Sequence, residues 1–87
     1  MNDTLEIRRR RLAWRAWHRG TRELDLMLGR YADATLASMG EAELHRFEEF
    51  LAVADPELHS WILKPDMDTG GEFAELVGAL RRFHGLG

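Results

Sequence analysis

With 87 residues, the chain is long enough for one domain but too short for two that each bury a useful core. Its 45% hydrophobic and 31% charged residues are typical of a globular protein, and the absence of Cys excludes disulfides, thiolate metal sites and a thiol nucleophile. The net charge of -3 is unevenly divided, because residues 1–30 carry 8 Arg against 4 acidic residues, whereas residues 31–87 carry 4 basic and 11 acidic residues. This asymmetry predicts that binding to a partner weakens as salt rises.

The first predicted helix runs from about Thr4 to His18. Asp3 is its expected N-cap. The helix is expected to stop before Gly20, because Gly commonly terminates helices. Its apolar positions are Leu5, Ile7, Leu12, Trp14, Ala16 and Trp17.

The second predicted helix begins at Thr21 or Arg22 and reaches about Ala37, and its apolar residues recur with the 3.6-residue period of a buried helix face. These residues are Leu24, Met27, Leu28, Tyr31, Ala32 and Leu36. Ser38 and Glu41 then have the spacing of a capping box, which predicts the start of a third helix. The buried stripe of that helix is expected to contain Leu44, Phe47, Phe50, Leu51 and Ala54.

A short fourth helix is predicted to begin with Asp55 as N-cap and Pro56 in the first helical position, followed by Leu58, Trp61 and Ile62. Residues 64–68 are typical of a loop, and Thr69 and Glu72 offer another capping box before a last helix. The apolar residues of this last helix are Phe73, Leu76, Val77, Leu80 and Phe83. The expected fold class is therefore all-α: a small five-helix bundle forming a single domain over residues 1–87, with residues 1–7 as a loose N-terminal extension.

Side chains that could catalyse a reaction or bind a metal are few. The histidines at positions 18, 45, 59 and 84 include no i, i+4 pair and no other ligand spacing of a metal site. Ser38 and Ser60 are the serines of the chain, no catalytic triad can be assembled around them, and no Gly-rich phosphate-binding motif is present. No apolar run approaches the roughly 20 residues that span a bilayer, and no export signal is found at the start. We therefore expect a cytoplasmic protein that binds another protein, with no catalytic residues and no metal.

The arginine run at positions 8–11, extended by Arg15, Arg19 and Arg22, supports an alternative interpretation. Arginines neutralise phosphates, so the chain could be a small basic-faced helical protein that binds nucleic acid or regulates another protein. The overall acidic charge, with a pI near 5.8, and the lack of a strand platform beneath the tryptophans argue against it. The same arginines also fit an ordinary solvated helix face.

The junction of the first two predicted helices has the pattern Arg19-Gly20-x-x-Glu23. Gly20 permits a positive φ and a close approach by another backbone, while Arg19 and Glu23 supply a forked donor and a carboxylate that could bind a partner. Each residue also has a structural explanation. Gly20 could terminate the first helix, Glu23 could be a first-turn anion favoured by the helix dipole, and Arg19 could form a surface ion pair with Glu23. The residues alone leave both interpretations open.

The segment from Arg11 to Gly29, with Arg-Gly-x-x-Glu between two helices, resembles the signature region of the succinate dehydrogenase assembly (flavinylation) factors, the SdhE family. The similarity extends from about Arg8 to Phe83 and includes Phe47-x-x-Phe-Leu, the Asp55-Pro56-Glu-Leu turn and Trp61. Trp17-His18 departs from the basic pair that many members carry before the motif.

This resemblance implies a five-helix protein that binds the flavoprotein subunit of succinate dehydrogenase, and in some bacteria of fumarate reductase, and promotes covalent attachment of FAD to a His of that subunit. It implies that the chain binds no cofactor stably and acts on FAD attachment in the partner. A monomer in the free state, without nucleic acid or membrane insertion, is expected. The motif residues Arg19, Gly20 and Glu23 are the leading predicted contacts, and the residues around them are added as further contacts: Arg11, Trp14, Arg22 and Asp25.

Overall fold

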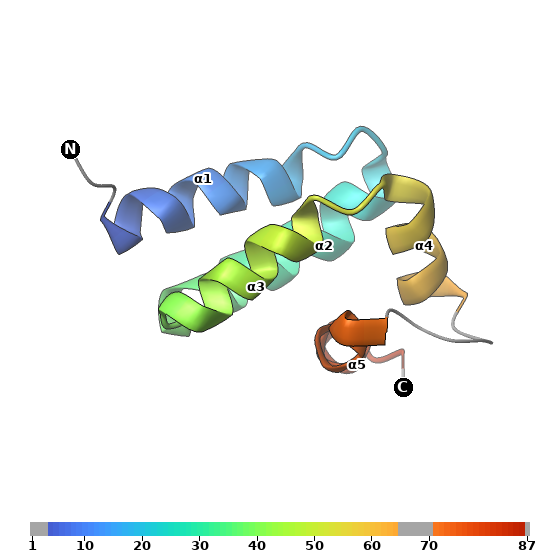
Figure 1. Ribbon diagram of the computed structural model, residues 1–87. Coiled ribbons are helices and arrows are strands. Elements are labelled where there is room, and N and C mark those ends of the chain that lie inside the picture. The colour runs from blue at the N-terminus through green and yellow to red at the C-terminus, as the bar shows by residue number, and fades with distance from the viewer. Residues whose placement is uncertain (1–3, 65–70, 87) are drawn as a thin grey trace. The chain divides into compact units, whose positions relative to one another are not determined.

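The computed structural model describes residues 4–64 and 71–86, and within these ranges it contains five α-helices, two short 3-10 helices and no strand. The α-helices are α1 (Leu5–Trp17), α2 (Arg22–Thr35), α3 (Glu41–Leu51), α4 (Asp55–Leu63) and α5 (Ala74–Phe83), and the 3-10 helices are η1 (Leu36–Ser38) and η2 (Gly71–Phe73) (Figure 1). The predicted all-α class with five helices is confirmed. The chain divides into two compact units, Met1–Ala52 and Val53–Gly87, and the single domain stays a prediction.

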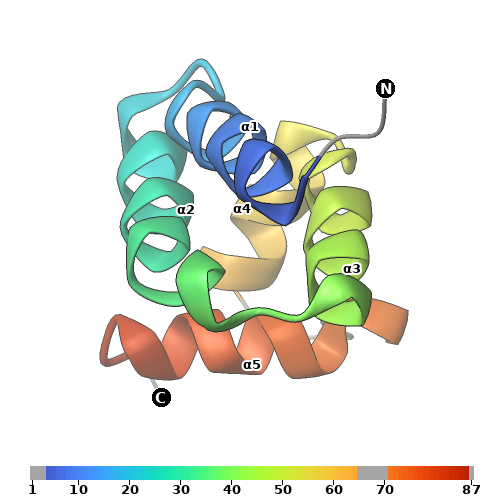
Figure 2. The same ribbon diagram turned by 90° about the vertical axis from the view of Figure 1, so that its left-hand side faces the viewer.

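In the first unit, α1 packs against both α2 and α3. Figure 2 shows α1 with α2 on one side and α3 on the other. Apolar residues at helical spacing supply the buried side chains of this unit, which are Leu12, Ala16, Leu24, Leu28, Tyr31, Ala32, Leu36, Met39, Leu44, Phe47, Phe50 and Leu51. The rings of Tyr31 and Phe47 have centroids 6.1 Å apart, which is within the range of favourable aromatic pairs.

The contact between α1 and α2 depends on a glycine. Gly29 is buried in α2, and a Cβ at this position would lie within 2.6 Å of three ring atoms of Trp17. The same indole donates a hydrogen bond from Nε1 to Asp33 Oδ2 at 3.2 Å. Trp17 therefore lies directly on the α2 backbone, and only Gly leaves room for it at position 29.

Two arginines of the basic run hold the first unit together. Arg9 donates from Nε to the Leu36 carbonyl and from Nη2 to the Met39 carbonyl, each at 2.8 Å. Leu36 is the first residue of η1, and its carbonyl also accepts from the amide of Met39, the C-cap of η1, at 3.1 Å. The forked guanidinium therefore binds carbonyls at both ends of this short turn and links α1 to it. Arg8 Nη1 lies 3.4 Å from Glu41 Oε2 at the start of α3. Part of the predicted basic face is thus used within the chain.

In the second unit, α4 packs against α5. Its buried side chains are Leu58, Ile62, Phe73, Val77 and Leu80. The Trp61 and Phe73 rings lie with centroids 6.2 Å apart. Arg81 of α5 donates to the carbonyl of Ile62 at the end of α4 and to that of Leu86, which links the end of α4 to α5 and to the residue Leu86 after it.

Three predicted helix starts are corrected by the structure. The expected cap Asp3 lies outside the described residues, and Thr4 caps α1 by accepting from the Ile7 amide at 3.2 Å, so residues 5–7 are helical rather than a loose extension. Ser38 belongs to η1 and donates to the Thr35 carbonyl, because the chain makes one more short turn before α3.

Gly40 is the N-cap of α3 instead, and its amide donates to Glu43 Oε1 at 3.0 Å. Ala54 is the N-cap of α4, which places Asp55 and Pro56 in its first turn rather than Asp55 at the cap. The predicted capping box at Thr69 and most of the predicted loop at 64–68 lie outside the described residues.

Some predicted apolar positions are exposed. Leu5, Ile7 and Phe83 are 38%, 41% and 45% exposed, and Ala54 is exposed rather than part of the α3 stripe. Trp14 is 63% exposed, the largest value among the exposed large hydrophobic residues of the described chain.

Within the described ranges, no helix has the length and hydropathy needed to cross a membrane.

Candidate functional site

The predicted site lies at the turn between α1 and α2, which we define as residues 18–25 and call the corner. Gly20 has a φ of +111°, a backbone conformation that L side chains rarely adopt. A Cβ at Gly20 would meet no atom within 4 Å, so the space beside this glycine is open. Gly20 thus adopts the positive φ that its residue type permits, and the corner offers room for the close approach of another chain.

The backbone of the corner is fixed by side chains from the first turn of α2. Asp25 Oδ1 accepts a hydrogen bond from the Arg19 amide at 2.6 Å, and Thr21 Oγ1 accepts one from the Leu24 amide at 3.3 Å. Thr21 thereby acts as the N-cap of α2. Glu23 and Asp25 lie in the first turn, where their negative charges interact favourably with the positive end of the helix dipole. The turn is thus a defined structure rather than a loose connection.

Arg19 has an internal role that the sequence did not reveal. Its Nη1 donates to the carbonyl of Leu51, the last residue of α3, at 2.6 Å, and the side chain is half-buried. The final carbonyls of a helix lack helical partners, so this bond satisfies one of them and joins the corner to the end of α3. The local sequence gives no signal for this contact, because the two residues are 32 positions apart.

The predicted contacts fall into two groups by exposure. Gly20, Arg22 and Glu23 are exposed at the corner, whereas Arg19 and Asp25 are half-buried and hold it in place. Arg11 and Trp14 are exposed on α1, one to two turns before its end. The structure therefore places the predicted residues along one continuous stretch of chain, with Arg19 and Asp25 positioned to support the exposed ones.

His18, which is not among the predicted contacts, is also exposed in this region. Its imidazole stacks on the Trp14 indole, with ring centroids 4.0 Å apart and an interplanar angle of 13°. Nδ1 of His18 lies 2.6 Å from the Trp14 carbonyl oxygen. The i, i+4 spacing of the two aromatic residues was the available signal, because such residues are neighbours on a helix surface.

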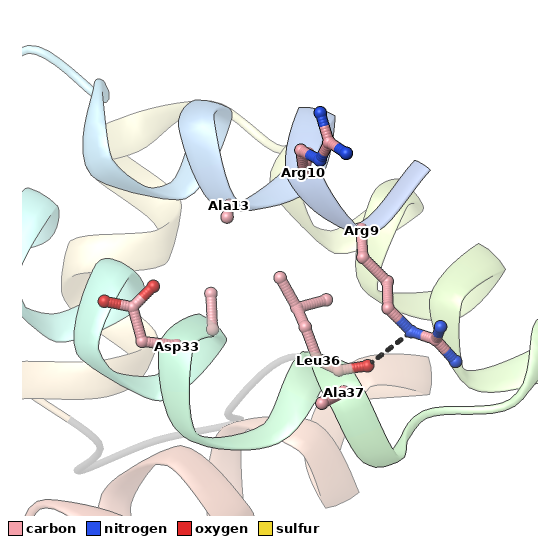
Figure 3. Close-up of a pocket in the computed structure, with 7 residues that line it drawn as sticks. Arg9, Arg10, Ala13, Asp33, Leu36 and Ala37 are labelled. Carbon is pink, nitrogen blue, oxygen red and sulfur yellow. Dashed lines mark hydrogen bonds between the residues drawn. The ribbon is translucent and has the colours of Figure 1, made fainter. Parts of the chain in front are cut away.

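A shallow groove of about 240 Å³ lies beside the N-terminal half of α1 and the end of α2 (Figure 3). Its lining residues are Arg9, Arg10, Ala13, Ala32, Asp33, Leu36 and Ala37. Figure 3 shows Arg9 bound to the Leu36 carbonyl, and Asp33 accepts the Trp17 hydrogen bond described above. None of the predicted contacts lines this groove.

Within residues 4–64 and 71–86, no three His, Asp or Glu side chains gather as a metal site would require.

Comparison with known proteins identifies relatives. The FAD assembly factor SdhE of Acetobacter pasteurianus is 45% identical over 60 residues, which are 69% of this chain and 55% of that protein. The protein of the same name from Xylella fastidiosa is 35% identical over 71 residues, 82% of this chain and 72% of that protein. The mitochondrial succinate dehydrogenase assembly factor 2 of Komagataella phaffii is 32% identical over 63 residues, 72% of this chain and 33% of that protein.

The matched segment thus spans less than two thirds of the Acetobacter and Komagataella proteins. No solved structure matches the chain significantly. A family described as the flavinator of succinate dehydrogenase matches residues 10–84, nearly all of the 87 positions. The chain therefore belongs to the family of flavinators of succinate dehydrogenase, in agreement with the resemblance of its Arg-Gly-x-x-Glu segment.

Proposed function

We propose that this chain is an assembly factor that binds the flavoprotein subunit of succinate dehydrogenase, hereafter the client, and promotes covalent attachment of FAD to it. Family membership and the names of the relatives support this function over nucleic-acid binding. The contacts of Arg8, Arg9 and Arg15 with groups of the chain itself also support it, because they reduce the charge available for phosphates. Fumarate reductase is a second proposed client.

The observation that carries this proposal is the open space beside Gly20 in a rigid corner. Asp25 fixes the Arg19 amide, and Arg19 in turn fixes the corner to the end of α3. A preorganised surface binds with a smaller loss of conformational entropy than a mobile one. We propose that this surface contacts the client through Gly20, Glu23 and Arg22, with Arg19 and Asp25 keeping them in place.

In this account, the reacting groups belong to FAD and to the client, and the chain supplies none of its own. Binding to one arrangement of the client, more tightly than to others, would keep the acceptor His and the flavin at reacting distance. The chain would need no stably bound cofactor and would act as a monomer in the cytoplasm. Catalysis by proximity requires only this difference in affinity between the two arrangements of the client.

The test compares two substitutions at one position. Gly20→Ala and Gly20→Arg place the same backbone strain on the positive φ, but only the arginine fills the open space. Each purified variant is incubated with apo client and FAD, and covalent flavin on the client is measured by in-gel fluorescence. Circular dichroism of both variants establishes whether helical content is kept.

We expect Gly20→Arg to abolish flavin attachment while Gly20→Ala retains most of it, with equal helical content in the two variants. If both variants support flavin attachment as well as the unmodified chain does, this space does not contact the client. Equal loss in both would place the requirement in the backbone conformation and would also contradict the proposal.

A further inference from the structure

The outward side of α1 carries an exposed stripe that the proposed corner does not include. Ile7, Arg11, Trp14 and His18 follow one another at intervals of 4, 3 and 4 residues. At about 100° per residue, these positions fall within an arc of roughly 60° on the helix. All four side chains are exposed, including Ile7 at 41% and Trp14 at 63%. We call these four residues the outer stripe.

The aromatic part of the outer stripe is held rigidly. His18 stacks on Trp14 with an interplanar angle of 13°, and its Nδ1 lies 2.6 Å from the Trp14 carbonyl oxygen. A carbonyl can only accept, so Nδ1 carries the hydrogen and donates it, which leaves Nε2 as the ring nitrogen that a partner can reach. A large exposed indole that is fixed before binding is the kind of side chain that anchors protein interfaces.

The charges around the outer stripe favour an acidic partner surface. Arg11 lies within the stripe, and Arg10 and Arg22 are exposed nearby in sequence. Positions 4–30 carry 8 Arg against 3 acidic residues, of which Glu6 lies 3.5 Å from Arg10 and Asp25 accepts the Arg19 amide, so the range keeps a positive net charge. A positively charged surface associates faster with a negatively charged surface, and it repels a second copy of itself. The stripe therefore fits a different, acidic protein surface better than self-association.

The outer stripe also continues into the proposed client-binding corner. His18 is the C-cap of α1 and stands two residues before Gly20, a separation of at most about 7 Å along the chain. A protein surface that reaches the open space at Gly20 would therefore lie next to the Trp14 and His18 stack. Typical interfaces contain about 20–30 residues on each side, so the few exposed residues of the corner cannot form one alone.

We propose that the outer stripe is a second part of the docking surface for the client, in which Trp14 enters an apolar pocket and Arg11 pairs with a carboxylate of the client. This inference rests on the proposed function. It assigns Ile7 and His18 to the interface and specifies the client surface as acidic around an apolar pocket.

The test measures affinity for the purified client, produced without any assembly factor, by biolayer interferometry. Trp14→Ala is expected to weaken binding at least about tenfold, as for an interface anchor, with Trp14→Phe restoring part of it. Arg11→Glu is expected to weaken binding at low salt and to reduce its salt dependence. Phe83→Ala is the matched control, because Phe83 is also an exposed aromatic residue beside a histidine, and its effect should stay within about twofold.

The outcomes separate this inference from the proposed function. If the unmodified chain neither binds the client nor supports flavin attachment, the proposed function fails. If it does both, and Gly20→Arg loses both while Trp14→Ala and Arg11→Glu bind as the unmodified chain does, the outer stripe is overturned and the corner stands. A change in mass by light scattering for Trp14→Ala, without a change in client affinity, would assign the stripe to self-association and would also overturn the inference.

Discussion

Replacing Gly29 by Ala should destabilise the protein, although Ala is the better helix former. In an exposed helix interior this substitution would stabilise by about 1 kcal/mol. Here the new Cβ would lie within 2.6 Å of three ring atoms of Trp17, far inside normal contact distance. Overpacking of this kind costs about 1–3 kcal/mol, and displacing the indole would also strain its 3.2 Å hydrogen bond to Asp33.

We expect a net loss of about 1 kcal/mol or more in the free energy of unfolding, because the clash outweighs the helix propensity. For a domain of this size, each kcal/mol lowers the melting temperature by about 4–8 °C. Circular dichroism at 222 nm during heating and urea titration give both quantities. In a Trp17→Ala background the clash is absent, so Gly29→Ala should become neutral or stabilising. An unchanged or raised melting temperature for Gly29→Ala alone would refute the assigned packing.

Two further predictions concern the arginines that bind carbonyls. Arg9→Ala should lower the free energy of unfolding by about 1–3 kcal/mol, because it removes the side-chain donor of the Met39 carbonyl and one of the two donors of the Leu36 carbonyl. Arg10→Ala, on the exposed neighbouring position, should change it by less than about 0.5 kcal/mol in urea titrations. Arg19→Ala should reduce both stability and client affinity, whereas Arg19→Lys, which keeps a donor able to reach the Leu51 carbonyl, should retain more of both. Equal affinity of Arg19→Ala and the unmodified chain would show that the corner does not depend on this bond.

The regular elements of this protein could be predicted from sequence because each one follows from local periodicity. The α2 stripe of Leu24, Leu28 and Ala32 is buried as its 3.6-residue spacing requires. The helix starts were less predictable, since Ser38 and Gly40 compete for the same N-cap and the extra turn of η1 decides in favour of Gly40. Cap choice depends on how the preceding chain is folded, which a single sequence window does not contain.

The candidate site was only partly accessible to sequence reasoning. The positive φ at Gly20 follows from its residue type and its place between two helices. The bond from Arg19 to Leu51 joins residues far apart in the sequence, and the close approach of Trp17 to Gly29 depends on how α1 crosses α2. Tertiary contacts of this kind decide whether an arginine or a tryptophan is a support or a contact, and no local pattern distinguishes the two.

The most direct measurement of the central claim is covalent flavin on the client as a function of added chain. Purified apo client and FAD are incubated with and without the unmodified chain, and the flavin that remains attached after denaturation is followed by in-gel fluorescence over time. We expect rapid flavin attachment in the presence of the chain, slow attachment in its absence, and slow attachment with Gly20→Arg. Attachment at the same rate with and without the chain would contradict the central claim.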